Sequence, residues 1–307
     1  MVEFFYRSSD LDLETYVSNR WIRQGTLAHQ KLQKQRPDNY ISELTISYQM
    51  QTGELDLKHF NISELQAFFD QITNHYYYWA IRLAKRLQNR DNTLKKLEFP
   101  YPDYRKGQRI MAVDICHTVR DKEHLLMQAP TGIGKTMAAL FPAYKALGMG
   151  LTDRIFYFTA RTTGKLIARD TTEILINNAI DIRALILTSK QSICFNPDSA
   201  CHPDDCKYAK GFYDRLPKAI DAVFDLKLYD RKTIEEFSRK FMICTFEFSL
   251  EIALWCDCII CDYNYAFDPR VYLKRFFDSP AENYTFLIDD RFFTLKYKKL
   301  LPTWWNI

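Results

Sequence analysis

The chain has 307 residues and a formal net charge of +4, and 47% of its residues are hydrophobic. This length predicts about two domains, and the apolar content is enough to form a sizeable core. With only 9 glycines and 11 prolines, the composition excludes collagen-like and broadly disordered proteins.

The sequence shows no run of about 18 apolar residues and no secretion signal at its start. We therefore expect a cytoplasmic protein with no membrane partner. The mildly basic charge permits a nucleic-acid partner without requiring one. In a reducing compartment, clustered cysteines more often bind a metal than form disulfides. The eight cysteines of this chain therefore suggest a metal site.

The first third of the chain predicts few elements. Residues 42–49 alternate apolar and polar side chains, which is typical of a strand, whereas residues 60–97 repeat apolar side chains at helical spacing. Two prolines within residues 99–104 then break the pattern.

After this break the sequence alternates short apolar runs with helical patterns. The predicted strands are residues 124–128, 155–159, 184–188, 259–262 and 284–289. Such alternation is typical of an α/β fold with a parallel sheet.

A predicted phosphate-binding loop follows the first of these strands. It comprises Ala129, Pro130, Thr131, Gly132, Ile133, Gly134, Lys135 and Thr136. The segment matches G-x-x-x-x-G-K-[ST] except for its first glycine, and it stands between a predicted strand and a predicted helix, as the motif requires. Backbone N–H groups and the helix N-terminus would bind phosphates, Lys135 would neutralise them, and Thr136 would ligate Mg²⁺. The alternative is a glycine-rich turn that binds nothing.

Four cysteines, Cys194, Cys201, Cys206 and Cys244, lie between this loop and the last predicted strand. Four thiolates suit either a [4Fe–4S] cluster or Zn²⁺, and spacing alone does not choose between them. His202 would be a further zinc ligand. The remaining alternative is four unrelated buried thiols. We predict that a second group, Cys256, Cys258 and Cys261, belongs to the core.

The order of these motifs resembles the XPD/DinG family of iron–sulfur DNA helicases. The resemblance covers roughly residues 99–290 and rests on A-P-T-G-I-G-K-T, F-T-A-R-T, the cysteine-bearing segment and C-D-Y-N-Y-A-F-D-P. It implies a RecA-like first motor domain, with a [4Fe–4S] cluster held by the four cysteines in an insert at about residues 190–245. In this chain Thr245 replaces the proline that usually follows the fourth cysteine.

The resemblance also implies roles for other residues. Gln108 would contact adenine, while Arg161, Thr162 and Lys165 would lie along the backbone of single-stranded or forked DNA. Asp289, at the end of the last predicted strand, would hold Mg²⁺, and Asp290 would orient the attacking water. The family pattern is D-E-A-H, so Asp290 is one methylene shorter than the usual glutamate, and the alanine and histidine are absent.

The two ends of the chain depart from the family. Residues 291–307 resemble none of it, and we expect an interrupted gene product that lacks the second motor domain. Residues 1–52 resemble a remnant of the RecB-like nuclease domain of bacterial members, although only Asp56-Leu57-Lys58 matches a nuclease pattern. Residues 53–98 are expected to form a helical connector to the ATP-binding domain at 99–290.

The sequence thus predicts a helicase-like protein that binds ATP, Mg²⁺, a [4Fe–4S] cluster and DNA. Whether it is an active enzyme stays open, because a missing motor domain and an altered D-E-A-H motif are expected to impair hydrolysis. The alternatives are a non-catalytic nucleotide- and DNA-binding fragment and a zinc-binding phosphate-loop module.

Overall fold

A computed structural model describes residues 43–49, 55–278 and 283–289. The chain divides into two units, residues 1–85 and 86–307, and each is described by itself. The predicted nuclease remnant therefore lies mostly outside the described residues, as do Asp290 and the C-terminal tail.

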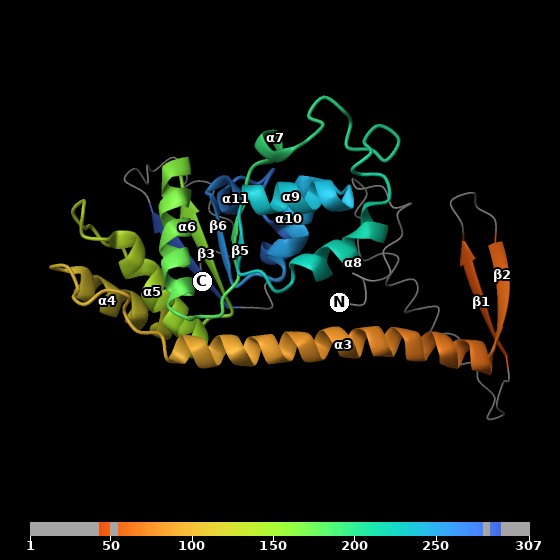
Figure 1. Cartoon of the computed structure of the whole chain (residues 1–307), viewed down its shortest axis with the longest axis horizontal. Coiled ribbons are helices and arrows are strands. Elements are labelled where there is room, and N and C mark those ends of the chain that lie inside the picture. The colour runs from red at the N-terminus through yellow and green to blue at the C-terminus, as the bar shows by residue number, and fades with distance from the viewer. Residues whose placement is uncertain (1–42, 50–54, 279–282, 290–307) are drawn as a thin grey trace. The chain divides into compact units, whose positions relative to one another are not determined.

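The first unit contains a hairpin and most of a long helix (Figure 1). Strands β1 (Glu43–Gln49) and β2 (Leu55–Asn61) pair antiparallel. Helix α3 (Ile62–Lys95) follows and continues into the second unit. Both the strand predicted at residues 42–49 and the helix predicted at 60–97 are confirmed.

The second unit is built on a parallel sheet, which confirms the predicted α/β class. Its order is β5-β4-β6-β3-β7, and every neighbouring pair is parallel. The strands are β3 (Arg154–Thr159), β4 (Ala184–Ile186), β5 (Leu228–Tyr229), β6 (Cys258–Asp262) and β7 (Tyr284–Asp289). Four of them match predicted strands, and β5 was not predicted.

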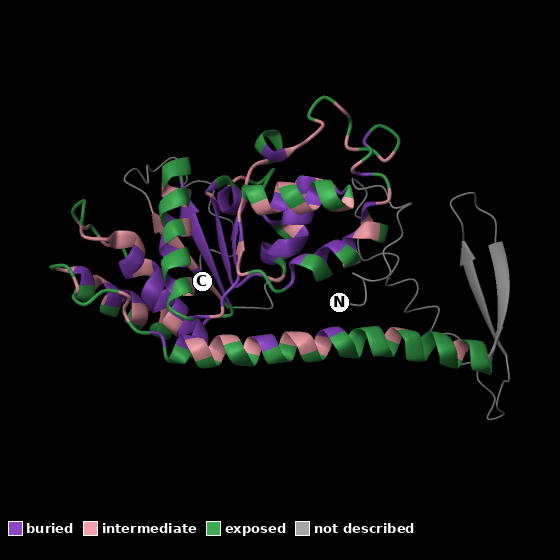
Figure 2. Ribbon diagram, viewed as in Figure 1, coloured by how far each residue is buried: buried purple, intermediate pink, exposed green. Residues whose placement is uncertain are grey.

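Two helices, α4 (Gln108–Asp121) and α5 (Lys135–Gly148), precede the first strand of this sheet. Helices also connect its strands, as parallel pairing requires. They are α6 (Thr162–Asn177), α7 (Lys190–Ile193), α8 (Phe212–Val223), α9 (Arg231–Phe241), α10 (Thr245–Ala253), α11 (Asn264–Phe267) and α12 (Lys274–Phe277). Figure 2 shows β3 and β6 as buried strands, while α6 exposes its outer face.

The two faces of β3 pack against different layers because successive side chains of a strand point to opposite sides. Ile155 and Tyr157 join a core with α5 and the C-terminal end of α3. On the other face, Phe156 and Phe158 pack against aromatic rings, with centroid separations of 5.1 to 5.8 Å. The thiols of Cys256, Cys258 and Cys261 are buried in this unit, as predicted.

A buried charge cluster ties the end of α3 to the sheet. Asp257, which is 3% exposed, accepts hydrogen bonds from Arg86, Arg90 and the main-chain N–H of Arg183. Burial, followed by the neighbouring cations of Arg183 and Arg90, lowers the pKa of the Arg86 guanidinium. One carboxylate therefore compensates two guanidinium groups at a desolvated position.

The strand predicted at residues 124–128 is wrong. This segment has no regular structure, and the side chain of Leu126 is 99% exposed. A strand exists only where another strand offers hydrogen-bonding partners. Within the described part of the chain, the sheet ends at β7 and this segment pairs with no strand.

Across the described ranges, no helix has both the length and the apolar character needed to cross a membrane.

Candidate nucleotide and nucleic-acid site

The predicted phosphate loop bends sharply where α5 begins. Gly132 and Gly134 have φ angles of 86° and 81°, in the left-handed region that favours glycine. The helix then starts at Lys135, so its first N–H groups, which have no partner within the helix, face the bend. Free N–H groups at a helix start are suited to bind an anion.

Lys135 lies across this bend. Its half-buried side chain donates a hydrogen bond to the carbonyl oxygen of Ala129, with an Nζ–O distance of 3.0 Å. The carbonyl thus holds the ammonium group within the loop that precedes α5. An incoming phosphate would exchange this neutral acceptor for a charged one, and charge-assisted hydrogen bonds are the stronger kind.

Thr136 and Asp289, the two predicted magnesium ligands, are connected by a phenol. The hydroxyl of Tyr157 donates to Oδ2 of Asp289 at 2.8 Å, and it also interacts with the side chain of Thr136. The structure therefore brings the hydroxyl and the carboxylate into one neighbourhood. Both are hard oxygen donors, the ligand type that Mg²⁺ prefers, so the residues present fit this ion.

The position of Asp289 follows from the sheet. It ends β7, where it pairs with Thr159 of β3, and its main-chain oxygen accepts a hydrogen bond from the Tyr263 hydroxyl at 3.1 Å. The carboxyl ends of parallel strands are where open α/β sheets bind ligands. The predicted partner Asp290 lies beyond the described residues.

The side chain of Gln108 is hydrogen-bonded to the phosphate loop. Its side chain is 3% exposed, its amide oxygen accepts from the N–H of Arg105 at 3.0 Å, and its amide nitrogen donates to the carbonyl of Gly134 at 3.2 Å. A Cβ at Gly134 would come within 2.5 Å of that nitrogen, and the positive φ of this residue also favours glycine. The predicted contact of Gln108 with adenine stays a prediction.

The predicted DNA contacts cluster at the start of α6. Arg161 and Thr162 are exposed where the helix begins. Lys165, in contrast, forms an ion pair with Asp262 at 2.9 Å, and its side chain is only 13% exposed. A Cβ at Gly164 would lie 2.2 Å from Oγ1 of Thr159, so this glycine allows the helix to approach β3. Arg161 therefore offers the more available charge.

The four cysteines of the predicted cluster lie between α7 and the start of α10. Cys194 follows α7, Cys201 and Cys206 lie in the next loop, and Cys244 directly precedes α10. Burial raises the pKa of Cys244 to about 11, and the nearby Cys194 adds to this effect. Cys201, and more weakly Cys244, raise the pKa of the Lys190 ammonium group, so this side chain lies near both thiols. Three of the four thiols thus share one neighbourhood.

Thr245 contributes to this arrangement. Its hydroxyl donates to the carbonyl of Ile193 at 2.8 Å, which ties the first turn of α10 to the end of α7. The bond brings Cys244 beside Cys194. The threonine that departs from the family pattern thereby acquires a structural role.

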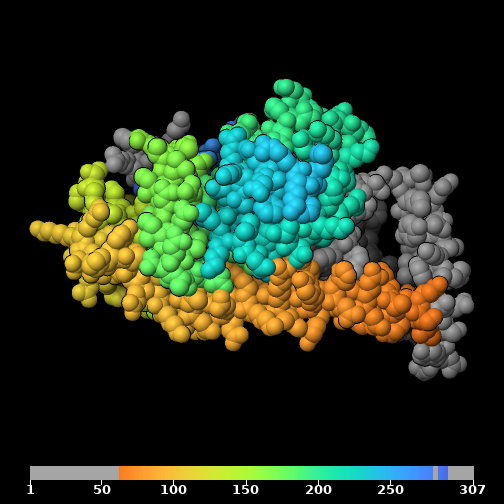
Figure 3. Space-filling model, in the orientation of Figure 1, coloured from red at the N-terminus to blue at the C-terminus, as the bar shows by residue number. Residues whose placement is uncertain are grey.

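The cysteines are not arranged around a single ion. Among the described residues, no group of three or more histidine, cysteine, aspartate or glutamate side chains is placed to hold a metal. Chemically, a set of four thiols fits an iron–sulfur cluster or zinc. Figure 3 shows the surface of the cysteine-bearing segment from α7 to α10, which includes α9, next to the surface of α6 on one face of the second unit.

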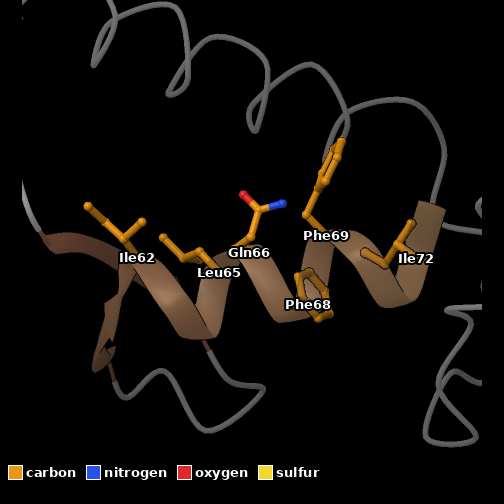
Figure 4. Close-up of a pocket in the computed structure, with 6 residues that line it drawn as sticks. All are labelled: Ile62, Leu65, Gln66, Phe68, Phe69 and Ile72. Atoms are coloured by element: carbon orange, nitrogen blue, oxygen red, sulfur yellow. The ribbon is translucent and has the colours of Figure 1, made fainter. Parts of the chain in front are cut away.

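A separate apolar groove runs along the first turns of α3 (Figure 4). It is lined by Ile62, Leu65, Gln66, Phe68, Phe69 and Ile72. Its polar lining residue, Gln66, donates to Asp70 at 2.9 Å. The groove offers no reactive group.

Two residues near the loop were not predicted from the sequence. Tyr157 connects Thr136 with Asp289, and Arg105 donates to the carbonyl of Gly132 at 2.5 Å. A hydroxyl inside a fully buried strand was the available signal for Tyr157, because buried polar groups need partners.

Comparisons with known proteins point to helicases. No family model matches the chain. A probable ATP-dependent helicase of Methanocaldococcus jannaschii is 44% identical over 48 residues, which cover 16% of this chain and 7% of that protein. The XPD helicase subunit of the general transcription and DNA repair factor IIH of Arabidopsis thaliana is 22% identical over 206 residues, covering 56% of this chain and 27% of that protein.

The solved structures that resemble this chain include two XPD proteins. An XPD helicase has a TM-score of 0.40 at 18% identity and covers 62% of this chain and 33% of that one. A truncated XPD has a TM-score of 0.38 at 18% identity and covers 58% of this chain and 50% of that one. The chain thus spans less than a third of the length of the two curated relatives, and its homology to XPD-type helicases rests on the sequence matches.

Proposed function

We propose that this chain is the nucleotide-binding part of an XPD-type, ATP-dependent helicase. It binds Mg²⁺–ATP at the loop 129–136 and single-stranded or forked DNA at the start of α6. The observation that carries the proposal is the convergence of Lys135, Thr136 and Asp289 at the carboxyl end of the sheet.

The chemistry follows from these groups. The N–H groups at the start of α5 and the ammonium of Lys135 bind and orient the phosphates. Thr136 and Asp289 hold Mg²⁺, which neutralises charge that develops on the transferred phosphoryl group. Arg161 supplies a cation for the DNA backbone, and such contacts are independent of base sequence and weaken with salt.

Titration of the full chain with a fluorescent ATP analogue and Mg²⁺ tests the proposal. Saturable binding that unlabelled ATP displaces supports it, whereas no binding up to millimolar nucleotide contradicts it. ATP turnover is measured in parallel, with and without single-stranded DNA. Turnover that DNA stimulates indicates an active motor, and binding without turnover indicates the non-catalytic alternative.

We further propose that Cys194, Cys201, Cys206 and Cys244 hold a [4Fe–4S] cluster, in keeping with a reducing, cytosolic environment. The support is the proximity of three of these thiols, Cys194, Cys201 and Cys244, and the bond from Thr245 that brings Cys244 to Cys194. Protein purified without oxygen is expected to contain iron and acid-labile sulfide in equal amounts. Cys244→Ser is expected to lose most of both, because it removes a ligand.

Cys116→Ser is the matched control, since this half-buried thiol lies on α4 and is not a proposed ligand. It is expected to keep its iron. Zinc in place of iron would contradict the cluster and favour the zinc-binding alternative.

A further inference from the structure

Tyr157 places a hydroxyl where an apolar residue would otherwise be expected. It lies in the middle of β3, is 1% exposed, and pairs with Ile260 on one side and Leu287 on the other. A buried hydroxyl without a partner is costly. The partners of this one are therefore informative about the site that they belong to.

The hydrogen-bond directions around the phenol are fixed by its charge state. A tyrosine phenol carries its proton at neutral pH and can both donate and accept a hydrogen bond. It donates that proton to Oδ2 of Asp289 at 2.8 Å. Its oxygen remains free to accept the hydroxyl proton of Thr136, with which it also interacts.

We propose that Tyr157 is a positioning residue of the magnesium–nucleotide site. By accepting the proton of Thr136, it would leave the Thr136 oxygen available as a ligand for Mg²⁺. It also fixes Asp289 through one carboxylate oxygen and leaves the other for the metal or its water. The inference rests on the proposed nucleotide site and adds to it the residue that orients both metal ligands.

A structural tyrosine and a positioning tyrosine differ in what their loss changes. A structural role affects only stability. Orientation of metal ligands affects metal affinity, and the loss of an outer partner of a ligand typically weakens it about 10- to 100-fold. Phosphate contacts made by the loop and by Lys135 do not pass through Tyr157.

Tyr157→Phe removes the hydroxyl alone and tests the proposal. The Mg²⁺ concentration that gives half-maximal nucleotide binding is expected to rise about 10- to 100-fold. Nucleotide affinity in EDTA is expected to stay within about twofold of wild type, because the phosphate contacts remain intact. Unchanged dependence on Mg²⁺ overturns the proposal.

Tyr144→Phe is the matched control. It also removes a buried hydroxyl, which is bonded to Thr172 at 2.9 Å. It is expected to reduce stability while leaving the dependence on Mg²⁺ as in wild type. A rise equal to that of Tyr157→Phe attributes the effect to general loosening of the core and overturns the proposal.

If Tyr157→Phe does not fold, a crystal structure of the wild-type chain with Mg²⁺ and a nonhydrolysable ATP analogue gives the decisive observation. Thr136 is expected to ligate the ion while within hydrogen-bond distance of the Tyr157 oxygen. A phenol turned away from both Thr136 and Asp289 overturns the inference. Failure of the wild-type chain to bind nucleotide at all overturns the proposed function itself, and this inference with it.

Discussion

Asp257→Asn is expected to lower the free energy of unfolding by about 3–5 kcal/mol, the cost of removing one partner from a buried ion pair. Asp257 is 3% exposed and accepts from Arg86 at 2.8 Å, from Arg90 at 2.9 Å and from the N–H of Arg183 at 2.8 Å. An amide is neutral, so the guanidinium groups would lose the buried charge that compensates them. Urea unfolding followed by circular dichroism measures the change.

The matched control is Asp121→Asn. Asp121 forms an ion pair with Arg120 at 2.7 Å, but both side chains are exposed. Exposed pairs contribute little because water and salt screen them. The urea midpoint of this variant is expected to remain near that of wild type. A small loss for Asp257→Asn, comparable with that of the control, would mean that water reaches the buried cluster.

Much of the sheet follows from the sequence because buried parallel strands read as continuous apolar runs. Three predicted strands coincide with strands of the structure, and their first residues differ by at most one position. They are residues 155–159, 259–262 and 284–289. Strand β5 was not predicted because its two residues are too few to show a repeating pattern of apolar side chains.

The run at residues 124–128 shows what local pattern leaves out. It contains three consecutive apolar residues, Leu125, Leu126 and Met127, yet Leu126 is almost fully exposed. Pairing depends on a neighbouring strand that can be far away in the sequence. A run of apolar residues carries no information about that neighbour.

The candidate site likewise combines local features that the sequence predicts with long-range contacts that it does not predict. The loop 129–136 and Asp289 were predicted, because glycine geometry and strand ends are local features. The hydrogen bonds and the ion pair that connect the site residues were not predicted. The bond from Tyr157 to Asp289 spans 132 residues of sequence, and the bond from Gln108 to Gly134 spans 26. The pairing of Lys165 with Asp262 also depends on the register of β3 and β6.

Lys135→Ala is expected to weaken ATP binding about 10- to 100-fold, since a hydrogen bond to a charged group contributes roughly 1.5–3 kcal/mol. In the structure the ammonium lies 3.0 Å from the carbonyl oxygen of Ala129, within the bend that the phosphates would enter. Alanine removes the charge and leaves the helix N-terminus in place. Competition titrations with ATP against the fluorescent analogue measure the loss.

Lys145→Ala controls for the loss of a lysine on the same helix. Its ammonium also donates to a backbone carbonyl, that of Leu97 at 2.8 Å, but from the last turn of α5. Its ATP affinity is expected to stay within about twofold of wild type, because this cation lies outside the bend. If Lys135→Ala also bound ATP like wild type, the loop would not be the triphosphate site. The convergence of Thr136 and Asp289 would then need another explanation, since Mg²⁺ is usually bound together with substrate phosphates.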